Sequence, residues 1–374
     1  MAIRGKFSEI SKQHSNEQIV DLGERALLPG LVNPHCHLDY TCLRGKIPRQ
    51  KSFTNWIRAI NAEKAKLSPG DFVASINEGF AEAKRFGTTT IANLTGFPEL
   101  ISRVDAPIRT WWFAELIDVR DPSRANQIVD HALSQLKSQE RWGFAPHSPF
   151  TSSADLYRRS EEVAKSENVL LTTHLAESPE EMSMFQHASG PLYQFLKEIG
   201  RDMSDFGGKT PVEWLLERAI EGSRPYLVAH LNELAEGDFD TLRKLSGQFS
   251  IVHCPRSHEY FGHSGFQFER LRRLGFNICV GTDSLASNED LSLFAEMRAF
   301  RRKFPDISPE QVLELVTVNS GRALQQEGVL GKIWSGFAAD LIAIPIERST
   351  PVFDEIVAFD GPVDWLMVGG EIFA

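Results

Sequence analysis

Short, almost continuously apolar runs recur along the chain, each ending in a polar residue or a histidine and followed by a stretch with helical spacing. Buried parallel strands have this character, because helices cover their outer surface and leave both faces dry. Eight runs fit the description, at residues 27–33, 88–93, 109–115, 141–146, 169–174, 226–230, 249–253 and 277–282.

The segments between the runs carry helix-start signals. Residues 68–71 (Ser-Pro-Gly-Asp) offer a capping serine, a proline at the first helical position and an acidic third position. Residues 308–311 (Ser-Pro-Glu-Gln) repeat this pattern, and residues 152–155 (Ser-Ser-Ala-Asp) show a weaker version. Eight strands alternating with helices predict an α/β fold, a (β/α)8 TIM barrel over residues 27–327. A doubly wound sheet is the alternative, but it does not explain where the histidines fall.

The two ends of the chain do not follow this alternation of strands and helices. Residues 1–26 and 328–374 read as short strands separated by glycines, and we expect them to form one small β-sandwich beside the barrel. The abrupt start favours a preceding strand that is missing from this chain. Residues 178–209 are unusually long for a segment after a strand, and segments at such positions commonly form lids or substrate walls.

The overall charge narrows the choice of partners. With 40 Lys and Arg against 50 Asp and Glu, the formal charge is −10, which argues against nucleic acid or an anionic membrane as the main partner. No signal peptide or long apolar run is present, so we expect a cytoplasmic protein that acts on a small molecule. The sequence is compatible with a homo-oligomer as well as with a monomer. The four cysteines show no metal-binding spacing and are expected to be buried thiols.

Histidines and one aspartate cluster at the ends of the predicted strands. The carboxyl ends of parallel barrel strands share one face, so these side chains are expected to converge there although they are distant in sequence. Three histidines and a carboxylate suit one divalent metal ion with a position left open for water. The residues concerned are His35, His37, His174, His230, His253 and Asp283, with His147 just beyond the fourth strand.

Four segments in this order resemble the amidohydrolase superfamily, and more closely its aminohydrolase branch of chlorohydrolases and of S-adenosylhomocysteine, guanine and aminodeoxyfutalosine deaminases. They are residues 29–37 (PGLVNPHCH), 173–177 (THLAE), 229–233 (AHLNE) and 281–288 (GTDSLASN). The resemblance spans nearly the whole chain, including a glycine-rich end similar to the family's returning β-sandwich.

The resemblance implies a role for each matching position. His35, His37, His174 and Asp283 match the ligands of a single metal ion, zinc most commonly and iron in some relatives. Glu177 matches the acid/base that moves a proton from the attacking water to the leaving group. His230 matches the imidazole that orients and activates that water, and Asp283 can also accept a proton. His147 matches a substrate contact of nucleoside deaminases.

The segment after the seventh strand departs from the family pattern. Many relatives have Ser-Asn where this chain has Ser257 and His258, with Arg256 before them. Arg256 and His258 are candidates for recognising a carboxylate or a sugar hydroxyl, with an unrelated loop network as the alternative. We add Ser287 to these substrate-binding candidates.

Together these observations predict a metal-dependent hydrolytic deaminase of an aminopurine nucleoside or a related heterocycle, with aminodeoxyfutalosine as one candidate. A chlorohydrolase or other C–X hydrolase acting on a triazine-like ring is the alternative within enzymes. A non-catalytic relative that keeps the barrel to bind a ligand is the alternative from another class. The intact Glu177 favours loss of ammonia, because a poor leaving group needs a proton whereas chloride does not.

Overall fold

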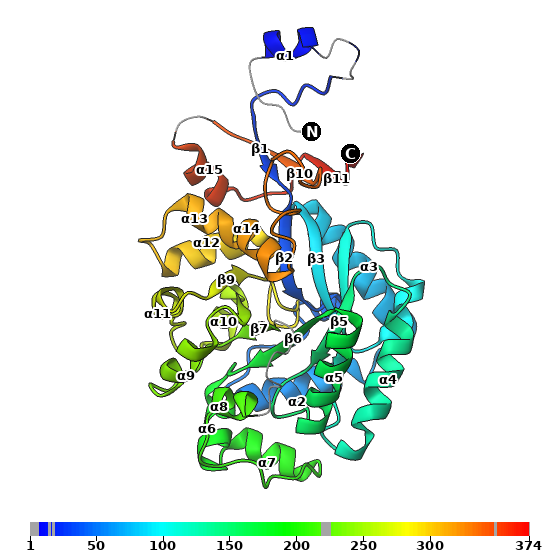
Figure 1. Cartoon of the computed structure of the whole chain (residues 1–374), viewed down its shortest axis with the longest axis vertical. Helices are drawn as coiled ribbons and strands as arrows, with labels where there is room; N and C mark the ends of the chain where they lie inside the picture. Colours follow the sequence, from blue (N-terminus) through cyan, green and yellow to red (C-terminus); the bar gives the residue numbers. More distant parts are fainter. Residues whose placement is uncertain (1–6, 14–15, 17–18, 218–225, 348–349, 374) are drawn as a thin grey trace.

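Eight parallel strands form the centre of the molecule (Figure 1). The computed structural model describes residues 7–13, 16, 19–217, 226–347 and 350–373. The strands pair in sequence order, as a barrel requires. They are β2 (Leu31–Cys36), β3 (Thr88–Thr95), β4 (Arg109–Leu116), β5 (Trp142–Pro146), β6 (Leu170–Leu175), β7 (Tyr226–His230), β8 (Phe249–His253) and β9 (Asn277–Val280).

The first and last strands meet and close the barrel. Cys36 and Asp283 form a parallel bridge, and the Asp283 amide donates to the His35 carbonyl at 3.2 Å. Gly281 makes this approach feasible, because a Cβ atom there would lie 2.8 Å from the His35 carbonyl oxygen. The predicted TIM barrel is confirmed, and the doubly wound alternative is wrong because the sheet closes on itself.

Helices surround the barrel and begin where the sequence signals place them. α3 (Pro69–Arg85) and α13 (Pro309–Leu315) start with reciprocal capping boxes, from Ser68 with Asp71 and from Ser308 with Gln311. α5 (Ala154–Glu167) starts at Ser153, whose side chain accepts from the Leu156 amide. The remaining helices around the barrel are α2 (Phe53–Lys64), α4 (Ala125–Leu136), α6 (Pro179–His187), α7 (Pro191–Glu198), α8 (Pro211–Leu216), α9 (Asp238–Leu245), α10 (Pro255–Phe261), α11 (Phe268–Arg273), α12 (Leu293–Lys303) and α14 (Val318–Ala323).

The chain ends pair into a four-stranded antiparallel sheet at one end of the molecule, with α6 and α7 at the opposite end (Figure 1). Its order is β1-β10-β11-β12, and α15 (Val352–Ala358) lies between β10 and β11 in sequence. The strands are β1 (Arg25–Pro29), β10 (Leu341–Pro345), β11 (Trp365–Val368) and β12 (Glu371–Phe373).

Two details of the expected chain ends need correction. The first apolar run, 27–33, contains two strands, because the chain leaves the small sheet at Pro29 and enters the barrel at Leu31. Part of the expected β structure before it is helical: α1 (Phe7–Gln13) has Glu9 in its first turn and Lys12 in its last, which suits the helix dipole. Residues 1–6 lie outside the described residues. Over the part of the chain that the structure describes, we find no helix long and apolar enough to span a membrane.

Candidate active site

Three histidines meet where β2 and β6 end. His35 lies in β2, His37 follows that strand directly, and His174 lies near the end of β6. The two-residue spacing of a strand turns His35 and His37 to the same side. One ring nitrogen from each of the three lies within 4.8 Å of the others, and all three residues are buried. Residues 137 positions apart thus form one cluster.

The cluster fits a shared divalent cation. Both ring nitrogens of His35 are buried and have no hydrogen-bond partner. His174 Nδ1 lies 2.8 Å from the His147 carbonyl, which can only accept, so Nδ1 carries the hydrogen and Nε2 presents a lone pair. That Nε2 is 3.2 Å from His37 Nε2. Two nitrogens bound to one zinc ion at a tetrahedral angle are about 3.3 Å apart, given bonds near 2.0 Å.

Asp283 supplies a carboxylate to this cluster. Its Oδ1 lies 3.8 Å from Nε2 of His35 and 3.8 Å from Nε2 of His37. Its other oxygen, Oδ2, accepts from the Ser257 hydroxyl at 2.6 Å. Ser287 Oγ lies 2.9 Å from Ser257 Oγ and does not line the cavity. Ser287 Oγ also lies 3.4 Å from Asp283 Oδ2, so Ser287 supports Asp283 both directly and through Ser257, and its contact with the substrate stays a prediction.

A second group joins the same site from the other side. The carboxylate of Glu177, His230 and Asp283 each contribute an atom within 4.8 Å of the others, and Glu177 Oε1 lies 3.7 Å from His230 Nε2. Burial raises the pKa of Glu177 well above its usual value, and the nearby charge of Asp283 adds to the effect. Burial also lowers the pKa of His230 well below its usual value. A buried glutamate beside an imidazole has the position and chemistry of a general acid–base.

The backbone is strained where it carries these residues. His230 has φ of 74° and Asp283 has φ of 57°, in the left-handed region that non-glycine residues seldom adopt. Each such residue costs on the order of 1–3 kcal/mol and persists where surrounding structure holds it. Here Leu231 donates to the Leu175 carbonyl at 2.9 Å, and Asp283 donates to the end of β2. The barrel rim therefore fixes both side chains in place.

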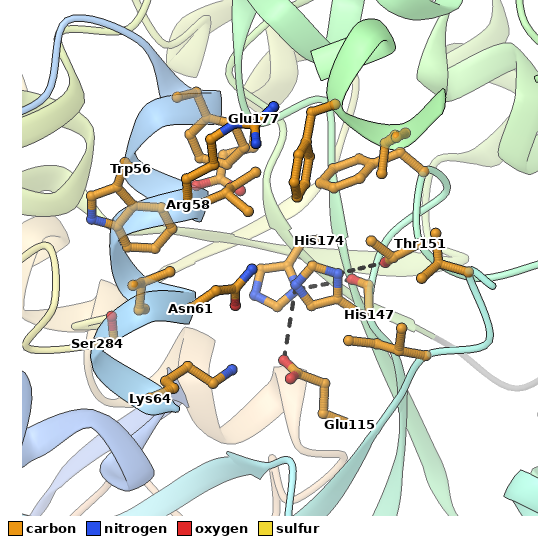
Figure 2. Close-up of a pocket in the computed structure, with 18 of the residues that line it drawn as sticks. Trp56, Arg58, Asn61, Lys64, Glu115, His147, Thr151, His174, Glu177 and Ser284 are labelled. Atoms are coloured by element: carbon orange, nitrogen blue, oxygen red, sulfur yellow. Dashed lines mark hydrogen bonds and ion pairs between the residues drawn. The ribbon is translucent and has the colours of Figure 1, made fainter. Parts of the chain in front are cut away.

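A cavity of about 590 Å³ opens above the histidines. His37, His147, His174, Glu177, His230 and Asp283 line its floor. Aromatic and aliphatic side chains from α2 and from the region of α7 line its walls, namely Phe53, Trp56, Ile57, Phe195, Leu196 and Ile199. Figure 2 shows Trp56, Arg58 and Asn61 of α2 around the imidazoles of His147 and His174. The long segment 178–209 is expected from the sequence to form a substrate wall. It contains α7, whose side chains line one part of the cavity wall.

Sequence reasoning missed four charged residues that line the cavity, namely Arg58, Lys64, Glu115 and Arg120. Glu115 lies near the end of β4, and its Oε1 is 3.8 Å from His37 Nδ1 and 4.0 Å from His147 Nε2. Its position at the end of the third apolar run is the same signal that identified the histidines. Lys64 ends α2 and also lines the cavity. No comparable sequence signal marks Lys64, because a terminal lysine is ordinary on a helix.

Three other predicted positions lie outside the cavity lining. Arg256 donates to Asp290 Oδ1 at 2.6 Å and to Glu289 Oε2 at 3.1 Å, so its guanidinium already binds two carboxylates. His258 Nδ1 faces the Asn232 side chain at 3.1 Å. His253 stacks flat on Phe266 with ring centroids 4.0 Å apart. Arg256 and His258 therefore bind other side chains in this structure, and their contacts with the substrate stay predictions, whereas His253 packs against Phe266.

The buried histidines make folding stability depend on pH. Burial lowers the pKa of His35 to about 3 and that of His174 to about 4, whereas an unfolded histidine titrates near 6.5. Between these values the unfolded chain binds more protons than the folded chain, so stability decreases as the pH falls below about 6.5. We expect the Tm of the metal-free protein to fall steadily from pH 6.5 to pH 4.5. Burial raises the pKa of Asp39 and of Glu181 to about 7, which opposes this slope. The measurement therefore compares wild type with His35→Ala, and an equal slope in the two proteins would show that His35 is not held neutral.

Curated proteins of known name are similar to this chain over most of their length. The chain is 27% identical to a 5-methylthioadenosine/S-adenosylhomocysteine deaminase of Archaeoglobus fulgidus, covering 98% of this chain and 87% of that one. It is also 27% identical to the Pyrococcus furiosus protein of the same name, over 98% and 88% of the two chains.

Solved structures agree with the fold. The aminofutalosine deaminase of Helicobacter pylori, bound to methylthio-coformycin, superposes with a TM-score of 0.86 at 20% identity and covers 99% of this chain and 92% of its own. A zinc-bound adenosine deaminase of Xanthomonas campestris gives 0.76 at 22% identity, covering 93% and 80%. The sequence model of the amidohydrolase family matches residues 26–373, nearly the full chain. The protein therefore belongs to the amidohydrolase family.

Proposed function

We propose that the protein is a metal-dependent hydrolytic deaminase of adenine-like nucleosides. The observation that carries this proposal is the position of Glu177, buried at the floor of a 590 Å³ cavity and grouped with His230 and Asp283 beside the three-histidine cluster. A buried glutamate with a raised pKa suits proton transfer to the substrate ring, a step that the loss of a poor leaving group such as ammonia requires. The names of the curated relatives support the same chemistry.

A metal ion completes the proposed site. His35, His37, His174 and Asp283 would hold it, and both zinc and iron suit imidazole and carboxylate donors. Such an ion, when bound, supplies Lewis acidity that makes a water molecule acidic near neutral pH. His174 is already fixed in the tautomer that leaves Nε2 free, by its hydrogen bond to the His147 carbonyl.

The reaction then depends on proton transfers by the chain's own residues. The water oxygen bonds to the ring carbon that carries the amino group. Glu177 transfers one water proton to the adjacent ring nitrogen, and Asp283 accepts the other and returns it to the amino nitrogen. The carbon–nitrogen bond breaks, ammonia leaves and the ring keeps a carbonyl. His230 holds the attacking water in line with the ring.

In this proposal, the apolar walls of the cavity and its charged residues bind different parts of the substrate. Trp56, Phe53 and Phe195 offer faces for a flat heterocycle. Lys64 donates to the Tyr40 hydroxyl at 2.7 Å and makes no ion pair with any residue that the structure describes. In a chain with a formal charge of −10, this cation is a candidate to bind an anionic group on the substrate.

We expect Lys64→Gln to raise KM about 10-fold or more for adenosine 5′-carboxylate, because a hydrogen bond to a charged group contributes about 1.5–3 kcal/mol. The matched neutral substrate, adenosine 5′-carboxamide, should show little change. Steady-state kinetics with both substrates measure the difference. Equal changes in KM for the two compounds would remove Lys64 from substrate recognition.

A substrate panel tests the proposed function. Purified protein loaded with Zn²⁺ is incubated with adenosine, 5′-methylthioadenosine, S-adenosylhomocysteine, guanine and a chlorotriazine, and both ammonia and chloride are measured. Ammonia from at least one adenine nucleoside is expected. Chloride release without ammonia would replace the proposal with a dehalogenase. Less than about half a metal ion per chain, with no activity on adding Zn²⁺, would support a non-catalytic binding protein.

A further inference from the structure

The turn that carries Glu177 is held on both sides. Glu177 lies two residues after β6, and Ala176 before it has φ of 50°. Ser178 follows and caps α6, where its side chain accepts from the Glu181 amide at 3.2 Å. A left-handed residue next to a catalytic one is a costly arrangement that needs support from neighbouring groups.

The amide side of the turn is bound by a buried carboxylate. Glu181 is fully buried, does not line the cavity and lies one helical turn after Glu177. Its Oε2 accepts from the Glu177 amide at 2.7 Å, and its Oε1 accepts from the Ala176 amide at 3.2 Å. Hydrogen bonds from amides to a charged acceptor are stronger than neutral ones. One side chain therefore fixes two consecutive peptide groups.

The carbonyl side of the turn is bound by Asn232, two residues after His230. The Asn232 side-chain amide donates to the Glu177 carbonyl at 3.1 Å. Its side-chain oxygen lies 3.1 Å from His258 Nδ1, which must carry the hydrogen to form this bond. The Asn232 backbone amide also donates to the Ala176 carbonyl at 2.9 Å. The bond to the Glu177 carbonyl sets which way the Asn232 amide points, and His258 faces the oxygen of that amide.

We propose that Glu181, Asn232 and His258 form a clamp that positions Glu177 for proton transfer. None of the three residues lines the cavity; Glu181 and Asn232 bind the backbone of Ala176 and Glu177, and His258 lies against Asn232, so they are positioning residues. The clamp joins the ends of β6 and β7 with α10, and so ties the position of Glu177 to that of His230 on the same rim. The proposal also assigns a role to His258, a position at which this sequence differs from the family pattern.

This inference rests on the proposed function, because its main readout is deamination. Misplacing a catalytic group by about 1 Å can lower a rate by about 100-fold. Asn232→Leu keeps the branched shape of the side chain but removes the donor to the Glu177 carbonyl. We expect it to lower kcat for 5′-methylthioadenosine by about 10- to 100-fold, with KM and metal content unchanged. His258→Leu should lower kcat in the same direction, and His258→Gln, which keeps a donor, should restore part of it.

A double-mutant cycle separates positioning from general destabilisation. If the clamp acts through Glu177, Asn232→Leu should change the residual kcat of Glu177→Gln by less than about 2-fold, because the group it positions is already absent. Glu181→Gln is combined with Glu177→Gln in a second cycle of the same kind, provided that the variant folds. Asn126→Leu, on the exposed face of α4, is the matched control and should leave kcat unchanged. Equal losses in both backgrounds, or losses that follow Tm alone, would overturn the clamp.

A crystallographic readout keeps the clamp separate from the proposed function. If the wild-type protein deaminates nothing in the panel, the proposed function fails, but the clamp is still tested by the position of Glu177. The distance from Glu177 Oε1 to His230 Nε2 is 3.7 Å. We expect it to lengthen in Asn232→Leu, and an unchanged distance would overturn the inference.

Discussion

Replacing Glu177 with glutamine should lower kcat by about 100- to 10,000-fold, the range that a positioned general acid–base contributes. Glutamine keeps the size of the side chain and its place beside His230, but it cannot take or give a proton. The substitution should leave metal content and Tm close to wild type, because Glu177 is not one of the four proposed ligands and does not belong to the three-histidine cluster. Removing a buried carboxyl with a raised pKa can even stabilise the fold.

The assay for this prediction is steady-state ammonia release with metal-loaded protein, corrected for metal content. Glu310→Gln makes the same chemical change on an exposed face of α13 and should be fully active. A Glu177→Gln protein with wild-type kcat would show that protons take another route. In that case Asp283 and His230 would be the groups left to carry them.

Replacing His35 with alanine should abolish metal binding and activity together. His35 is the most enclosed of the clustered histidines, with no exposed surface and no hydrogen-bond partner for either ring nitrogen. Its only evident role in the described structure is to offer a lone pair to a cation. We expect about one metal ion per chain in the wild type and less than about a tenth in the variant.

Chelation provides the complementary experiment for the metal site. Wild-type protein treated with a chelator should lose activity and regain it on adding Zn²⁺ or Fe²⁺, and the ion that restores more activity identifies the better cofactor. His35→Ala should not recover under either condition. His131→Ala, an exposed histidine on α4, is the matched control and should retain metal. Full activity in a metal-free wild-type protein would contradict the proposed chemistry.

The barrel could be predicted from the sequence because its signals are local and repeated. Each strand is a short apolar run, and the ends of the strands share one face by topology, so His35 and His174 could be placed together without a structure. The boundary at Pro29 was not predicted, because one apolar run supplies strands to two different sheets. Helix α1 was also missed, since its seven residues show no clear period.

The substrate-binding residues were harder to predict, because they depend on side-chain partners distant in sequence. In the sequence, Arg256 has no obvious charged partner and is interpreted as a substrate contact. In the fold, its guanidinium binds Asp290 and Glu289, which lie more than 30 positions further along the chain. From the sequence, Ser287 is interpreted as a substrate contact, but in the fold its hydroxyl bonds to Ser257 and to the Asp283 carboxylate. Lys64 gives no signal until α2 is seen to lie across the strand ends. Such pairings are set by tertiary packing and have no period along the chain.

The most direct test of the central claim is deamination of 5′-methylthioadenosine in water labelled with oxygen-18, with product mass and ammonia measured together. The account predicts one labelled oxygen at the former amino carbon for each ammonia released, with the rate lost in Glu177→Gln and in His35→Ala. Ammonia without label in the product, or labelled product formed equally fast by Glu177→Gln, would contradict it.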